Sequence, residues 1–397
     1  MEGEVKRYIL ESFREKYSRA GKREKGRLLI EVCQKFGYHR KHAIRLMKPQ
    51  DVGRRKVGAK RGPKSKYNDP EFLKALHRVR KVMEFRTSQI LKSNMPEWLP
   101  SIEKHYGAFL PEIRAKLLTI SPATMDRYFK RMREKSGKGL TTTRPGTILR
   151  NEIMIQTASQ WNSTIPGIMS TDTVAHCGNT TAGQYAYSLD MVCPVLHWVE
   201  LRAVWGKGES GVLEQTKDIE KSLPFRLVGA HVDNGTEFLN WHYYRYFSEG
   251  EARKNFKLTR SRPNKKDDNC YVEQKNWSVV RRYFGYDRLH FPELVPLMND
   301  LYKNELSLYL NHFCPTFKVE QKILIKSRFK RIYGKPITPY HRVLECHHIH
   351  DDVKIMLKDL HQTLDPVALK LTIERKLKNI FSLLRKLNTA RKATSAA

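Results

Sequence analysis

The stretch GIMSTDTVAHCGNTTAGQYAYSLDMV, residues 167–192, decides the fold. It is rich in Tyr, Val and Thr, and turn-forming Gly178 and Gly183 divide it into strand-like segments at 167–174 and 184–192. A third such segment, 196–205, follows directly after Pro194. Three strands in such close succession predict an antiparallel meander.

Downstream of the meander, helical and strand patterns alternate. The sequence predicts a helix over 211–223, a strand over 226–232, a helix over 238–252, a strand over 256–261 and a helix from about 271. Three strands followed by this alternation indicate an α/β domain, in which helices pack on a mixed five-stranded sheet.

Three carboxylates fall at informative places in this order. Asp172 lies inside the first strand, although a carboxylate is a poor strand former and costly to bury unpaired. Asp233 ends the fourth strand, where α/β sheets place ligand groups, and Glu273 falls on the first turn of the last helix. Converging carboxylates repel one another unless cations hold them, and two divalent metals about 3.5 to 4 Å apart suit such a cluster. Hard oxygen ligands favour magnesium, or manganese.

Alternatives stay open around these residues. A single Asp at a strand end is usually a turn cap, and Glu237, Asp267 and Asp268 are nearby substitutes within the cluster. His176 shares the strand face of Asp172 and is either a packed histidine or a group that orients a metal-bound water.

The segments Val232–Phe238 and Asn269–Asn276 resemble the sequences that flank the catalytic carboxylates of bacterial insertion-sequence transposases with a retroviral-integrase-like core. Asp172, Asp233 and Glu273 look like the Asp-Asp-Glu triad of that family, and Asp172–Gly178 is similar to the first-strand motif of one of its branches. Asp233 and Glu273 are separated by 39 residues, slightly more than is usual in the family. The resemblance spans roughly residues 145–345, without the His-His-Cys-Cys zinc module of retroviral integrases.

This resemblance implies an RNase H-like fold and metal-dependent DNA cleavage and strand transfer. Asp172, Asp233 and Glu273 would be catalytic and would hold two Mg²⁺ ions, with Mn²⁺ as a substitute. The expected partners are double-stranded DNA, both element ends and target, and further copies of the chain in a dimer or larger complex. A DNA-binding regulator with an inactive RNase H-like core and a simple RNase H-like nuclease are the alternatives.

The charge is unevenly distributed along the chain. The 397 residues carry a net charge of +33, which divides into +23 for residues 1–150, −1 for 151–300 and +11 for 301–397. Because Lys and Arg that contact phosphates release condensed counterions, nucleic acid is the expected partner, and an anionic membrane surface is the rival. The division predicts DNA binding at the two ends and a different task at the centre.

The first basic segment has the pattern of a helix-turn-helix over residues 1–50. A helix over 22–35 and a second over 39–47 are separated by a turn at Phe36–Tyr38. The second helix presents Arg40, Lys41 and Arg45, which could enter a major groove. An ordinary helical hairpin with a solvated basic face is the alternative.

A basic linker, residues 51–67, follows. Its glycines and prolines break any regular structure, so it is either an extended strand in a DNA minor groove or a solvated tether. The expected DNA contacts here are Arg54, Arg55, Arg61 and Lys64.

The sequence pattern of residues 68–135 predicts a second helical unit that resembles a helix-turn-helix. Phe72, Leu76 and Met83 mark one apolar stripe, and Ser121-Pro122 is typical of a helix start. The helix that begins there presents Arg127, Lys130 and Arg131. Lys275, just after Glu273, could likewise guide a phosphate backbone, although surface solvation explains it equally well.

The predicted organisation continues with a linker over 136–162, the catalytic core over 163–310, a small basic region over 311–350 and helices over 351–397. A long amphipathic helix through Leu369 and Leu387 either packs in cis or joins protomers.

The remaining composition favours a soluble protein that is not secreted, and the resemblance implies a cytoplasmic location in association with the bacterial nucleoid. Mean hydropathy is −0.60, no apolar run is long enough to cross a membrane, and the charged start Met1–Arg7 does not suit a signal peptide. The six cysteines contain no Cys-x-x-Cys pair and are expected to be reduced thiols.

Overall fold

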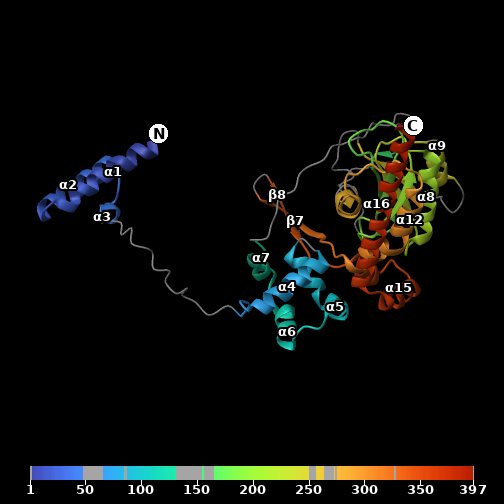
Figure 1. Cartoon of the computed structure of the whole chain (residues 1–397), viewed down its shortest axis with the longest axis horizontal. Helices are drawn as coiled ribbons and strands as arrows, with labels where there is room; N and C mark the ends of the chain where they lie inside the picture. Colours follow the sequence, from blue (N-terminus) through green and yellow to red (C-terminus); the bar gives the residue numbers. More distant parts are fainter. Residues whose placement is uncertain are drawn as a thin grey trace. The chain divides into compact units, whose positions relative to one another are not determined.

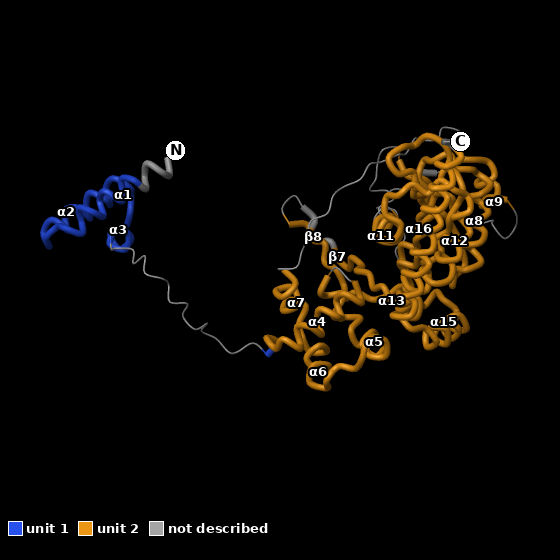
Figure 2. Tube along the Cα trace, in the orientation of Figure 1, with its two compact units in different colours: residues 1–66 blue, residues 67–397 orange. Residues whose placement is uncertain are grey.

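The computed structural model describes residues 2–47, 66–84, 87–130, 154–155, 165–249, 256–262, 272, 275–325 and 328–396. The chain forms two compact units, Met1–Lys66 and Tyr67–Ala397 (Figure 2). The predicted linkers 51–67 and 136–162 fall almost entirely outside the described residues.

The first unit contains three helices: α1 (Glu2–Arg19), α2 (Lys22–Phe36) and α3 (Arg40–Met47). α2 ends because Gly37 adopts a left-handed conformation, with φ of 65°, that glycine accepts without strain. Phe13 of α1 packs with Leu29 and Val32 of α2 and with Ala43 and Met47 of α3. The two predicted helices are therefore present, and α1 adds a third.

The second unit is built on a six-stranded sheet in the order β1-β6-β5-β2-β3-β4. Figure 1 colours the chain along its sequence, from blue at the N-terminus to red at the C-terminus. The strands are β1 (Met154–Ile155), β2 (Ile168–Ala175), β3 (Ala186–Val192), β4 (Val199–Trp205), β5 (Gly229–Val232) and β6 (Lys257–Arg260). β2, β3 and β4 form the predicted antiparallel meander, and β5 and β6 run parallel to β2. The five predicted strands make a mixed sheet consistent with an RNase H-like fold, and the two-residue β1 extends it by one edge strand.

Helices cover both faces of this sheet. Successive side chains of a strand point to opposite faces, and here both sets are apolar. Leu189 and Met191 of β3 face one layer, whereas Ala186 and Val192 face the other. The first layer comprises α8 (Glu209–Ser222), α9 (Trp241–Ser248), α14 (Pro339–Glu345) and α15 (Asp351–Thr363). The second comprises η5 (Asn276–Arg281), α11 (Arg282–Phe284), α12 (Leu294–Asp300), η6 (Leu301–Leu306), α13 (Ser307–Phe313) and α16 (Pro366–Ala396).

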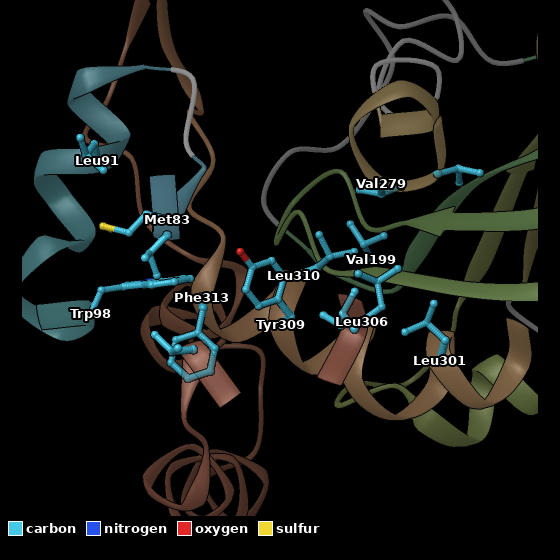
Figure 3. Close-up of a cluster of buried hydrophobic side chains, with 14 of the residues drawn as sticks. Met83, Leu91, Trp98, Val199, Val279, Leu301, Leu306, Tyr309, Leu310 and Phe313 are labelled. Carbon is cyan, nitrogen blue, oxygen red and sulfur yellow. The ribbon is translucent and has the colours of Figure 1, made fainter. Parts of the chain in front are cut away.

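The second predicted helical unit packs onto this second layer and shares its hydrophobic core. It consists of α4 (Pro70–Met83), α5 (Ser88–Tyr106), α6 (Pro111–Thr119) and α7 (Pro122–Phe129). The fully buried Trp98 of α5 lies with its ring 6.0 Å from that of Tyr309 and 6.4 Å from that of Phe313 (Figure 3). The side-chain amide of Asn94 also donates to the carbonyl of Phe313 at 2.7 Å, so polar as well as apolar contacts join α5 to α13.

The long C-terminal helix packs in cis. Ile373, Ile380 and Leu384 of α16 are buried, and the helix contacts α5, α12, η6 and α13. Of the two alternatives that the amphipathic pattern left open, the structure shows packing within the chain.

The predicted small basic region contains a two-stranded hairpin, β7 (Val319–Ile325) and β8 (Arg328–Tyr333), followed by α14. In the part of the chain that the structure describes, no helix is long and apolar enough to cross a membrane.

Candidate active site

Aspartates from three neighbouring strands lie side by side across the sheet. Asp172 of β2 pairs with Asp190 of β3 in the antiparallel ladder. On the other side, Thr171 of β2 pairs with Val232 of the parallel strand β5, so Asp233 follows that strand beside Asp172. The structure thus brings together Asp172 and Asp233 at the carboxyl end of β5.

The turn after β5 fixes the Asp233 side chain. The backbone N–H of Gly235 donates to Oδ1 of Asp233 at 2.8 Å, and the Asn234 side chain donates to the carbonyl of Ser261 at 3.0 Å. A Cβ on residue 235 would come within 2.3 Å of Oε2 of Glu237. A side chain at residue 235 would therefore displace the Glu237 carboxylate, which lies directly over the turn.

Glu237, one of the alternatives raised by the sequence, is a fully buried member of this group. Its Oε1 accepts hydrogen bonds from the Thr173 hydroxyl at 2.9 Å and pairs with the Lys207 ammonium at 2.9 Å. Its Oε2 is buried without a hydrogen-bond partner among the described residues. Three carboxylates, those of Asp172, Asp233 and Glu237, therefore share this edge of the sheet.

The crowding shows in the electrostatics of Asp233. Burial raises the pKa of its carboxyl well above the usual range, and the negative charges of Asp172 and Glu237 raise it further. The Gly235 hydrogen bond and the Lys207 ammonium oppose this pKa shift only in part. A cation at this edge would relieve the repulsion.

Asp172 is oriented from two directions. The backbone N–H of Thr173 donates to its Oδ1 at 2.8 Å, and the side-chain amide of Asn276 donates to its Oδ2 at 2.7 Å. Asn276 begins η5 and stands three residues after Glu273, which lies outside the described residues. In the described part of the chain, no three His, Cys, Asp or Glu side chains form a ready-made metal site.

Asp190, which pairs with Asp172 across the sheet, was not predicted from the sequence as a site residue. It is fully buried, and neither of its carboxylate oxygens has a hydrogen-bond partner among the described residues. Burial raises the pKa of Asp190 far above its usual value; the charge of Lys275 opposes the shift and that of Asp172 adds to it. The signal that identified Asp172, a carboxylate inside a strand, is also present in Ser188-Leu189-Asp190-Met191.

Lys275, expected to contact DNA, is half-buried and lies close enough to Asp190 for their charges to interact. Burial lowers the pKa of its ammonium, and the negative charge of Asp190 acts in the opposite direction.

The other predicted DNA contacts lie at the surface or outside the described residues. Arg40, Lys41 and Arg45 are exposed on α3, and Arg127 and Lys130 are exposed at the end of α7. The contacts that fall outside the described residues are Arg54, Arg55, Arg61, Lys64 and Arg131.

His176 is a packed side chain. It is fully buried, with Nε2 2.8 Å from the Ser188 hydroxyl and its ring against Phe284. Burial lowers the pKa of the imidazole to about 3, and the charge of Arg281 adds to this effect. The ring is therefore neutral at physiological pH.

The comparison with known proteins identifies the family. The uncharacterized protein y4rM of Sinorhizobium fredii (strain NBRC 101917 / NGR234) is 33% identical over 342 residues, which cover 84% of this chain and 93% of y4rM. The chain belongs to the y4rM family. No protein-family model matches the sequence.

Among solved structures, the catalytic core domain of BIV integrase superimposes with a TM-score of 0.30 and 14% identity. The match covers 46% of this chain and 96% of the integrase domain. A superposition at this level supports no conclusion about function. The functional proposal therefore rests on the residues of the site itself.

Proposed function

We propose that this chain is a DNA transposase of the integrase type, which binds the ends of a mobile element, cleaves DNA and joins the freed end to target DNA. The observation that carries the proposal is the juxtaposition of Asp172, inside β2, with Asp233, at the carboxyl end of the parallel strand β5. Burial and mutual repulsion disfavour the charged form of Asp233, and a divalent cation at this place would offset that penalty and stabilise the ionised carboxylates.

The residues at this edge fit Mg²⁺, or Mn²⁺, in their chemistry. Carboxylate oxygens are the ligands that both ions prefer, and Oε2 of Glu237 is a buried oxygen without a hydrogen-bond partner among the described residues. Asp172, Asp233 and Glu273 would hold two ions. When bound, the ions supply Lewis-acid stabilisation of the charge that develops during phosphoryl transfer.

The chain's own contribution is orientation. Thr173 and Asn276 hold both oxygens of Asp172, and the Gly235 N–H holds Asp233. Glu273 precedes Asn276 by three positions in the sequence, and the contact of Asn276 with Asp172 is the reason we propose Glu273 as the third catalytic carboxylate. In the first step a water molecule would attack the phosphodiester at the element end and break its bond to the flanking strand, which leaves a free 3′-hydroxyl. This hydroxyl would then attack a phosphodiester of the target, form the new bond and release a 3′-hydroxyl of the target strand.

The basic ends of the chain would hold the DNA. Residues 1–150 carry a net charge of +23, and the exposed Arg40, Lys41 and Arg45 share one short helix that could lie in a major groove. Two element ends must meet for joining, so we expect a dimer or larger complex on DNA. The site of action would be the nucleoid of a bacterial cytoplasm.

The test uses labelled DNA that carries candidate element ends, incubated with the full chain and Mg²⁺. Nicked ends and strand-transfer products are expected from the wild type. Asp233→Asn should lose at least about 100-fold in rate while keeping its DNA affinity, because the metal charge contributes several kcal/mol to the transition state. Exchanging Arg40, Lys41 and Arg45 for Gln should instead weaken DNA binding and lower its salt dependence.

The rival functions give different products. Cleavage without any joined product would indicate an RNase H-like nuclease. DNA binding without Mg²⁺-dependent cleavage would indicate a regulator, and full activity in Asp233→Asn would refute the metal-site proposal.

A further inference from the structure

Lys207 stands beside the acidic edge of the sheet, on the loop between β4 and α8. Its ammonium lies 2.9 Å from Oε1 of Glu237. The Lys207 side chain is 26% exposed, whereas that of Glu237 is wholly buried. Lys207 is also the positive charge that acts on Asp233, against the negative charges of Asp172 and Glu237. One partly solvated lysine thus pairs with Glu237 and also acts on Asp233.

The loop that carries Lys207 has room to move. Gly206 and Gly208 flank the residue, and a Cβ on either glycine would meet no atom within 4 Å. Gly206 also has a φ of 66°, which only glycine adopts freely. A long, flexible side chain on an uncrowded loop can leave its partner at little cost in packing.

The Glu237 side chain, in contrast to that of Lys207, is held firmly in place. It is anchored by Thr173, next to Asp172 in the chain, and its second oxygen is buried without a hydrogen-bond partner among the described residues. If Lys207 left and nothing replaced it, a buried carboxylate would remain without a counter-charge, which is strongly unfavourable. The departure of Lys207 therefore requires another cation at the same edge.

We propose that Lys207 is the resident counter-cation of this cluster and that it gives way when a divalent metal binds. The inference rests on the proposed function, because it concerns the same metal site. Lys207 keeps the carboxylates together in the metal-free protein, and Glu237 supplies the negative charge for which the lysine and the metal compete. Lys207 is thus a positioning residue that sets metal affinity.

The experiment is a calorimetric titration of the metal-free full chain with Mn²⁺. Lys207→Met removes the competing charge, so its Mn²⁺ affinity should rise roughly tenfold over the wild type. Its melting temperature without metal should fall, because the carboxylates then repel one another unopposed. Glu237→Gln should weaken Mn²⁺ binding. A merely structural role would move the affinity of both variants in the same direction.

Two further variants serve as controls. Lys207→Arg retains the charge and should not gain affinity. Lys303→Met breaks an ion pair of similar length, with Asp218 at 2.8 Å, far from the cluster in the sheet, and should leave Mn²⁺ affinity unchanged.

The outcomes separate the two proposals. A wild type that binds no Mn²⁺ would refute the proposed metal site itself. A wild type that binds Mn²⁺, an Asp233→Asn variant that does not, and a Lys207→Met variant with unchanged or weaker affinity would refute only the role of Lys207. If Lys207→Met fails to fold, Lys207→Gln takes its place, with the same expected gain.

Discussion

Two groups of buried charged residues on the same sheet differ in how completely they are hydrogen-bonded and paired. On β4, Glu200 and Arg202 are both almost completely buried. Glu200 accepts hydrogen bonds from the Trp198 indole, the Ser307 hydroxyl and Arg202, and Arg202 in turn donates to Asp218 at 2.6 Å. On the neighbouring strand β3, the equally buried Asp190 has no hydrogen-bond partner within the described part of the chain.

The difference distinguishes a structural charge from a functional one. Buried polar groups normally find partners, and those that do not need an explanation. The charges on β4 form a closed network that stabilises the sheet. Asp190, Asp233 and Glu237 are crowded and underpaired at the edge where we place the metal site, so fold stability alone does not explain them.

The largest stability effect is expected from Arg202→Met. This change leaves Glu200 buried without its counter-charge, so the free energy of unfolding should fall by about 3 to 5 kcal/mol. Urea unfolding followed by circular dichroism measures it. A loss below about 1 kcal/mol would show that the β4 network is not the stabilising group.

Asp190→Asn should have a smaller, pH-dependent effect. The folded-state pKa of Asp190 is raised, so its contribution to stability is fully present below the unfolded pKa near 3.8 and is lost as pH rises towards the folded value. Between these two pKa values, the free energy of unfolding of the wild type should fall by about 1.4 kcal/mol for each pH unit. The Asp190→Asn variant should lack this dependence on pH. Unfolding in EDTA between pH 4 and 8 tests it. Asp218→Asn is the control that should keep the slope, because the pKa of Asp218 is lowered. An unchanged slope in Asp190→Asn would contradict the inferred burial of an unpaired carboxyl.

The smallest effect is expected from Asp218→Asn, at the solvent side of the paired network. Partial burial alone would raise the pKa of Asp218, but hydrogen bonds from Lys303 and Arg202 outweigh it and lower the pKa. Its stabilisation is therefore present above the unfolded pKa and is lost as pH falls. The Asp218 side chain is 33% exposed, so we expect a loss of only about 0.5 to 1 kcal/mol at pH 7, with a flatter acid limb of unfolding.

Most of the sheet could be predicted because its sequence signals are local. Turn-forming glycines and Tyr-, Val- and Thr-rich segments marked the three meander strands, and the predicted helix over 211–223 is α8, Glu209–Ser222. α5 gave no such signal because Pro96 and Pro100, which normally interrupt helices, lie inside it.

The candidate site was predictable only in part. Asp172 and Asp233 were recognisable from their positions at strands. The pairing of Asp190 with Asp172 depends on the register between β2 and β3, which the strand patterns alone do not fix. The contact between Lys207 and Glu237 likewise joins two loops. The apolar period of α16 predicted a helix but not the surface it covers, because that surface is assembled from α5, α12, η6 and α13.

The packing of α16 against helices from the start of the second unit affects how this unit folds. The Lys370 ammonium binds the carbonyl of Val82 at 2.8 Å and pairs with Glu84 at 2.9 Å, across 288 and 286 positions of sequence. At the start of the helix, Asp365 pairs with Lys104 and His105. A ribosome adds about 5 to 20 residues per second, so α4 and α5 spend many seconds with their apolar faces uncovered before α16 emerges. We therefore expect the growing chain to be prone to aggregation until α16 is synthesised, and its folding yield to rise when chaperones cover these apolar faces.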